Sequence, residues 1–188
     1  MSQNIIMPYR YATGGIDDDQ LKCYWRYDEA SGDIINQSVS AVTNGSSADL
    51  QITGATYESG SPPLGNSLYF ASGDLGTAGT SLSDWNFMHS TDAAFTIATW
   101  YKCNSFSSSE MVFYNTNQLT TAKGFAFRTI TTTKLVLLAY NGSGAGAQYL
   151  AARTTADYVP DTTNWHFYVV TRDQASDATT FRRDDANE

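Results

Sequence analysis

The 188-residue chain has two cysteines, two histidines and 11 basic residues, and each shortage excludes a class of protein. Two cysteines cannot form the multi-disulfide framework of a small secreted domain. Cys23 and Cys103 each share a strand face with apolar neighbours, which predicts two buried, reduced thiols, with one disulfide as the alternative. Two histidines, His89 and His166, give no sequence support for a zinc centre or a Ser-His-Asp arrangement.

Basic charge is outweighed by 19 acidic residues, which gives a formal net charge of −8. Such a field repels phosphate backbones and anionic lipid, so we expect no nucleic-acid partner. The longest apolar run, Leu135 to Tyr140, is too short to span a membrane, so no membrane partner is expected. The N-terminus carries no basic n-region and no apolar run of signal-peptide length, which predicts a protein made and kept in a cytoplasm unless a leader was removed.

Glutamate is also rare, at Glu29, Glu58, Glu110 and Glu188. The nearest pair of carboxylates is Asp28-Glu29, and adjacent residues of a strand point to opposite faces. A glycosidase needs two carboxylates that flank one glycosidic bond. We therefore predict that the chain is not an enzyme and has no catalytic residues.

Aromatic residues and turn signals are abundant. Aromatic side chains make up 13% of the chain, and rings pack well on a pleated, half-buried surface. Short runs of alternating polarity are separated by Gly, Asn, Asp and Ser, with no helical period beyond one turn near Leu82 to Phe87. The predicted fold class is all-β, a two-sheet antiparallel sandwich. Its predicted strands are Leu21–Tyr27, Asp49–Thr53, Ala55–Tyr57, Ser67–Ala71, Phe95–Cys103, Met111–Asn115, Gly124–Thr129, Lys134–Tyr140, Gln148–Ala152, Trp165–Arg172 and Ala178–Arg183.

Two predicted strands carry the clearest alternation. The opening stretch places Leu21, Cys23, Trp25 and Tyr27 on one face and ends in a turn at residues 29–33. In the strand Phe95–Cys103, Trp100 lies on the less apolar face, where it either forms the floor of a groove or lies under a crossing loop.

The two ends of the chain differ from the sandwich at residues 21–188. Residues 1–20 predict an extended N-terminal arm, because Ile5, Ile6, Met7, Tyr9 and Tyr11 lie among turn residues without a period. The arm either docks on a neighbouring subunit or is a floppy terminus. At the other end, Ala178–Arg183 leads into turn residues at Asp184-Asp185-Ala186-Asn187, with no return strand after them. An unpaired edge would result, so we expect the last strands to be missing, either because the polypeptide continues or because another chain covers the edge.

The chain resembles the laminin-G-like branch of the concanavalin A-like lectin/glucanase superfamily. Four segments match in order: Tyr24-Trp25-Arg26-Tyr27-Asp28-Glu29 with Ser31-Gly32; Asn66-Ser67-Leu68-Tyr69-Phe70; Phe95-Thr96-Ile97-Ala98-Thr99-Trp100-Tyr101-Lys102; and Trp165-His166-Phe167-Tyr168-Val169-Val170 with Thr171 and Asp173. The resemblance implies a jelly roll of one convex and one concave antiparallel sheet, with ligands bound at loops along the rim. Ile34-Ile35-Asn36-Gln37 stands where the family often has an aspartate, which puts an inherited calcium site in doubt.

Candidate binding residues follow from chemistry. A sugar site needs an exposed ring beside amides and carboxylates, and the best matches are Asp84-Trp85-Asn86 and Tyr140-Asn141, with core packing of the two rings as the alternative. No metal-binding residue is assigned. Calcium stays open, because oxygen ligands cluster at Asp17 to Asp19, Asp28 with Asp33, and Asp173 with Asp177, although each cluster is also ordinary turn chemistry.

Three functions remain open. The first is a non-enzymatic structural and adhesion module of a virion, such as a phage capsid decoration, fibre or tail component. It would join other virion subunits through its arm, form part of an oligomeric assembly and bind surface glycans. The second is a carbohydrate-binding domain of a secreted or cell-surface protein, which would be extracellular. The third is a degenerate glycoside hydrolase.

Overall fold

The fold is described by a computed structural model, in which part of the chain is placed well enough to describe. The structural statements below concern that part. It comprises residues 22–27, 29–36, 49–61, 65–71, 73–78, 85–89, 94–104, 111–114, 123–130, 133–141, 148–155, 157–159, 161–173, 175–184 and 186–187. The predicted N-terminal arm, residues 1–20, lies outside it.

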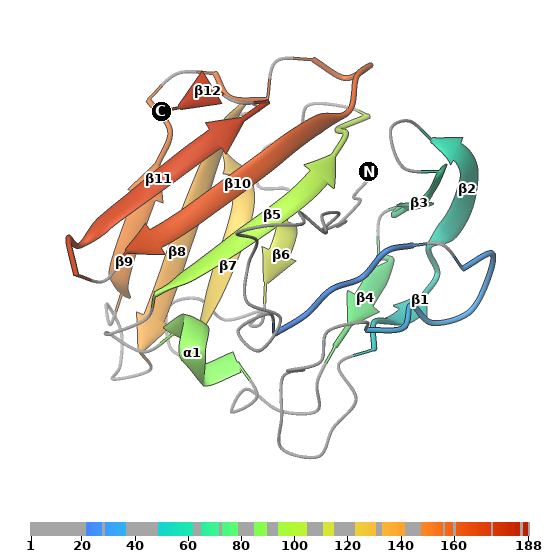
Figure 1. Cartoon of the computed structure of the whole chain (residues 1–188), viewed down its shortest axis with the longest axis horizontal. Coiled ribbons are helices and arrows are strands. Elements are labelled where there is room, and N and C mark those ends of the chain that lie inside the picture. Colours follow the sequence, from blue (N-terminus) through green and yellow to red (C-terminus); the bar gives the residue numbers. More distant parts are fainter. Residues whose placement is uncertain are drawn as a thin grey trace, which may run out of the picture.

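Two four-stranded antiparallel sheets form most of the structure (Figure 1). The first has the order β12–β11–β10–β5, and the second has the order β6–β7–β8–β9. The first sheet consists of β5 (Phe95–Tyr101), β10 (His166–Asp173), β11 (Ala178–Arg183) and β12 (Ala186–Asn187). The second consists of β6 (Met111–Tyr114), β7 (Lys123–Ile130), β8 (Lys134–Asn141) and β9 (Gln148–Arg153). The chain leaves the first sheet after β5, builds the second as a meander and returns with β10 beside β5.

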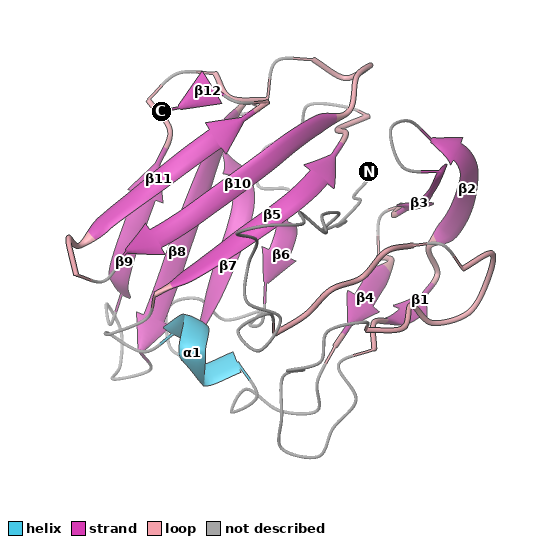
Figure 2. Ribbon diagram, viewed as in Figure 1, coloured by secondary structure: helices cyan, strands magenta, loops and turns pink. Residues whose placement is uncertain are grey.

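The N-terminal half adds two small antiparallel sheets and one helical turn. β1 (Gln51–Thr53) pairs with β4 (Leu75–Thr77), and β2 (Thr56–Ser61) pairs with β3 (Gly65–Tyr69). The helical turn α1 (Asn86–His89) packs against β7 and β8. Figure 2 shows that strands dominate and that both small sheets lie to one side of the two large ones. No helix of the described part is long and apolar enough to cross a membrane.

The core lies between the two large sheets. Phe95, Ile97 and Tyr101 of β5 alternate with more exposed neighbours, because successive side chains of a strand point to opposite faces. Phe127 of β7 and Phe181 of β11 meet across the sandwich with ring centroids 6.5 Å apart. The all-β prediction is confirmed, and the packing of the two sheets is sandwich-like.

Strand β8 is buried on both faces. Leu135, Leu137 and Ala139 belong to the main core. Val136, Leu138 and Tyr140 form a second apolar cluster on the opposite face. A central strand covered on both sides reads as a continuous apolar run instead of alternating, which explains the run from Leu135 to Tyr140 in the sequence.

The opening stretch is partly as predicted. Cys23, Trp25 and Tyr27 are buried, and Cys23 and Cys103 are buried thiols that form no disulfide, as expected. A regular strand over residues 22–27 is a wrong prediction, because the only pairing there is an isolated bridge between Trp25 and Asn36. Tyr27 adopts a positive φ of 60°, which is incompatible with a strand. The Asn36 Oδ1 atom also accepts a hydrogen bond from the Tyr24 N–H over 2.7 Å.

The predicted turn at the end of β11 is present. Asp184 has a φ of 47°, and the two residues of β12 pair back onto Arg182 and Arg183. In the described part, the outer edge of β11 has no further strand partner from Ala178 to Phe181. Coverage of that edge by more of the polypeptide or by a second chain stays a prediction.

Candidate functional site

The rings predicted to bind sugar are packed. Trp85 is buried, its Nε1 donates to the carbonyl oxygen of Ala78 over 3.2 Å, and its ring lies 6.0 Å from that of Phe87. Tyr140 belongs to the second apolar cluster on β8. Both therefore show the core packing given as the alternative. Asp84 lies outside the described residues, as do the side chains of Asn86 and Asn141, so their role in ligand binding stays a prediction.

The described acidic side chains mostly cap turns and backbone groups. Asp33 Oδ1 accepts from the N–H of Ile52 over 2.9 Å. Asp173 accepts from the N–H of Ala175 and from the Ser176 hydroxyl, at 3.0 and 2.6 Å. These bonds hold the pKa of Asp173 below its usual range, with the Ser176 hydroxyl as the largest cause. In the described part, His, Cys, Asp and Glu form no group of three that could hold a metal ion. Asp17 to Asp19 and Asp28 are outside that part.

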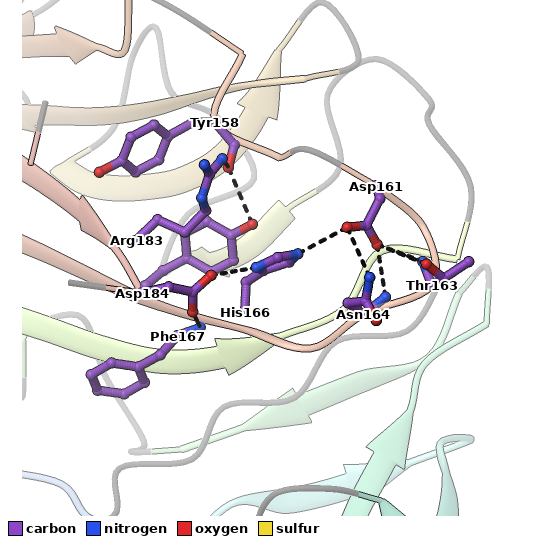
Figure 3. A network of polar contacts seen from close by, with 9 residues as sticks. Tyr158, Asp161, Thr163, Asn164, His166, Phe167, Arg183 and Asp184 are labelled. Atoms are coloured by element: carbon purple, nitrogen blue, oxygen red, sulfur yellow. Dashed lines mark hydrogen bonds and ion pairs between the residues drawn. The ribbon is translucent and has the colours of Figure 1, made fainter. Parts of the chain in front are cut away.

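The most connected polar cluster surrounds His166, the first residue of β10 (Figure 3). His166 Nδ1 contacts Asp184 Oδ2, and His166 Nε2 lies 3.2 Å from Asp161 Oδ2. Asp161 comes from the turn before β10, and Asp184 comes from the turn between β11 and β12. We call these three residues the histidine clamp. It joins three chain segments at one end of the first sheet.

Each carboxylate of the clamp is itself fixed by the backbone. Asp161 Oδ1 accepts from the N–H groups of Thr163 and Asn164, at 2.8 and 2.7 Å. These bonds, with that of Asn164 as the largest cause, hold the pKa of Asp161 well below its usual range. Asp184 exchanges two bonds with Phe167. Its Oδ1 accepts from the Phe167 N–H over 2.8 Å, and its own N–H donates to the Phe167 carbonyl over 3.0 Å.

A layer of buried Tyr158 and Tyr168 with half-buried Arg183 underlies the clamp. The Tyr158 carbonyl accepts from the Tyr168 hydroxyl and from Arg183 Nη1, at 3.3 and 2.9 Å. The Arg183 guanidinium also lies 5.2 Å from the centroid of the Tyr158 ring, a cation–π distance. Burial is the main cause that raises the pKa of Tyr168. Every polar group named in this layer has a structural partner, so the layer supports the clamp without offering a reactive group.

The outward face of the first sheet carries a second candidate site. Trp100 and Phe167 are paired in register across β5 and β10, and their rings are 5.2 Å apart and tilted by 45°. The next row across the sheet is Ala98, Val169 and Arg182, and the row after that is Thr96, Thr171 and Thr180. We call these three rows the outer face. Successive rows lie two residues apart along each strand, which is about 7 Å.

The outer face is partly accessible. Thr96 and Arg182 are exposed, while Trp100, Phe167 and Val169 are half-buried. Trp100 Nε1 is buried and has no hydrogen-bond acceptor, an uncommon state for a buried donor. The position of Trp100 on the less apolar face of β5 is confirmed. Whether its ring forms the floor of a groove or lies under a crossing loop stays a prediction. A face with an aromatic end and a hydroxyl end can stack on a flat apolar surface and hydrogen-bond beside it.

Comparison with known proteins gave no match to a family model, a curated protein or a solved structure. The functional reading therefore rests on the residues themselves.

Sequence reasoning missed the clamp. His166 was considered only as one of two histidines that give no sequence support for a zinc centre or a Ser-His-Asp arrangement, and Asp184 lies 18 residues further along the chain. The turn Asp161-Thr162-Thr163-Asn164 is a readable signal, since an aspartate there can accept backbone N–H groups of the next residues. The meeting of both carboxylates at one imidazole depends on sheet register, which the sequence does not display.

Proposed function

We propose that the chain is a non-enzymatic structural and adhesion module of a virion, such as a phage capsid decoration, fibre or tail component, on a concanavalin A-like jelly roll. Its adhesive site is the outer face, which binds a glycan. The observation that carries this proposal is that the side chains of the outer face change along the strands from the Trp100–Phe167 ring pair at one end to a row of threonines at the other.

The chemistry of the outer face suits a carbohydrate. An aromatic ring stacks on the apolar C–H face of a sugar, while protein hydroxyl and guanidinium groups form hydrogen bonds with the sugar hydroxyls. Thr96 Oγ1 and Thr171 Oγ1 lie 3.3 Å apart, within hydrogen-bond distance. Whichever hydroxyl accepts in that bond keeps its own proton to donate to a ligand. The distance from the ring row to the threonine row is about 14 Å from strand geometry, which suits an oligosaccharide better than a single sugar.

A glycan array with the complete chain tests the adhesive function. We expect binding that falls at least about tenfold, or about 1.4 kcal/mol, in Trp100→Ala and Phe167→Ala. Ile35→Ala is the matched control, because Ile35 is an exposed apolar side chain, 57% accessible, outside the outer face. Absence of binding to every glycan at millimolar protein, or equal loss in the control, would overturn the proposal.

The virion setting is tested separately. Reconstitution with the products of neighbouring genes should yield a stable complex that includes the chain, and those genes should encode capsid, portal or tail proteins. Glycan binding together with secretion and no such neighbours would instead favour the carbohydrate-binding domain of an extracellular protein. Turnover of a glycoside by the purified chain would favour the hydrolase.

A further inference from the structure

The two contacts of the histidine clamp depend on how many protons the His166 ring carries. An ionised carboxylate only accepts hydrogen bonds, and a neutral imidazole has one N–H and one lone pair. His166 places both ring nitrogens against carboxylate oxygens, those of Asp184 and Asp161. Both contacts can be hydrogen bonds only when the ring carries two protons. We propose that the clamp is a pH-sensitive latch, closed by the imidazolium form of His166, that holds the β11–β12 turn on the start of β10.

Neither carboxylate can easily move away when the ring loses a proton. Thr163 and Asn164 hold Asp161 through both backbone N–H groups, and Asn164 Nδ2 also donates to Asp161 Oδ2 over 3.2 Å. Asp184 is held by its two bonds with Phe167. A neutral ring must therefore turn a lone pair toward one of two fixed oxygens. That contact becomes repulsive, and the latch opens on that side.

Other charged and titratable groups lie near the His166 ring. Arg183 of β11, the ring and carbonyl of Tyr158 and the hydroxyl of Tyr168 lie in the layer beneath the clamp. His166 pairs in register with Tyr101 of β5, and Cys103 follows β5 near Tyr168. In the described part, Arg183 is the cation of this group, and its bond to the Tyr158 carbonyl directs it away from the imidazole.

The part held by the latch is the end of the first sheet. Asp184 has a positive φ, which turns the chain so that β12 can return. Its bonds to Phe167 continue the β10–β11 pairing one step beyond the pair Tyr168–Arg183. An open latch should loosen this step, and with it the two-residue strand β12. The remaining core contacts of β10 and β11 do not pass through the clamp, so the sandwich itself should stay folded.

The direction of the pH effect follows from linkage. The closed latch retains a proton on His166, so its contribution to stability is present when the ring is protonated and is lost as pH rises. On the acid side the latch fails when its carboxylates are protonated. The pKa of Asp161 is lowered by the N–H groups of Asn164 and Thr163, so this half stays ionised until pH falls through that lowered value. The latch is therefore closed in mildly acidic solution and opens toward alkaline pH.

Ring-nitrogen NMR on the full chain tests the proposal directly. The chain has two histidines, so His89→Gln leaves His166 as the sole imidazole. We expect amide exchange at Phe167 and Asp184 to speed up in step with the loss of the second ring proton of His166. Asp161→Asn and Asp184→Asn should each remove this coupling.

Asp173→Asn is the matched control. It removes a carboxylate that caps a turn of the same β10–β11 hairpin, at the end away from His166. The control should keep the coupling between His166 protonation and Phe167 exchange. His166→Gln should lower Tm by about 2–4 °C in mildly acidic solution and have a smaller effect at alkaline pH. Exchange at Phe167 that is independent of His166 protonation, or an unchanged His166 titration in both clamp variants, would overturn the proposal.

Discussion

Trp100 and Phe167 lie side by side on the outward face of neighbouring strands, with ring centroids 5.2 Å apart. Their strand neighbours Tyr101 and Tyr168 point the opposite way and pack in the core, with ring centroids 6.1 Å apart. The same pair of strands thus builds the core with one face and the proposed adhesive site with the other.

Alkaline pH should destabilise the fold through Tyr57. Burial, followed by the charges of Glu29 and Asp33, raises the pKa of Tyr57 to about 12. The unfolded chain ionises this phenol near pH 10, so the folded state binds more protons above that value. Stability should therefore be intact below about pH 10 and fall as pH rises toward about 12.

Thermal unfolding followed with pH checks the Tyr57 prediction. Tyr57→Phe should remove the Tyr57 part of the alkaline loss, and Glu29→Gln should shift the phenol absorbance transition to lower pH. A Tyr57 phenol that titrates like a free tyrosine would contradict it.

Gly54→Ala should destabilise the protein more than Gly32→Ala. Both glycines have positive φ, 85° and 82°, so each alanine costs about 1 kcal/mol of backbone strain. A Cβ at position 54 would also meet Oδ1 of Asp74, whereas one at position 32 meets nothing within 4 Å. Asp74 cannot move freely, because its Oδ2 accepts from the Ala71 N–H over 2.7 Å. Denaturant melts should show an extra loss of about 1–3 kcal/mol for Gly54→Ala, and equal losses would be inconsistent with this contact.

Thr154→Ala should leave the buried N–H of Leu135 without its hydrogen-bond acceptor. Thr154 is buried, and its Oγ1 accepts from the Leu135 N–H over 3.1 Å. Removing that oxygen leaves the N–H without this acceptor, which costs about 1–3 kcal/mol. Thr154→Ser keeps the oxygen and should lose less. Urea melts of both variants give the comparison, and a serine variant as weak as the alanine variant would assign the loss to the methyl group instead.

Sequence patterns predicted the half-buried strands well. Ile97 and Tyr101 alternate with polar or exposed neighbours, because one face of β5 packs on the core and the other does not. For Tyr140 the sequence left two alternatives, an exposed sugar-binding ring and a core residue. The structure shows the core residue, because β8 is a central strand with both faces covered. Which faces a neighbouring layer covers is a tertiary property that a local pattern does not contain.

The clamp and the outer face were missed for a related reason. Trp100 was singled out only because alternation places it on the less apolar face of its strand. Its pairing with Phe167 depends on the register of β5 and β10, which are more than 60 residues apart along the chain. His166 meets Asp184 through the same kind of long-range register. The two-residue alternation of a strand shows which face each side chain occupies. It carries no information about which other strand lies beside that strand.

Mapping the bound glycan by amide and indole NMR tests the central claim most directly. With the glycan selected on the array, we expect shifts to concentrate on the Trp100 indole N–H, which has no acceptor in the structure, and on the amides of Thr96, Thr171 and Thr180. Trp100→Ala should abolish these shifts while the spectrum of the core stays unchanged. Shifts centred on Trp85–Asn86 and Tyr140–Asn141, with the outer face unaffected, would contradict the account.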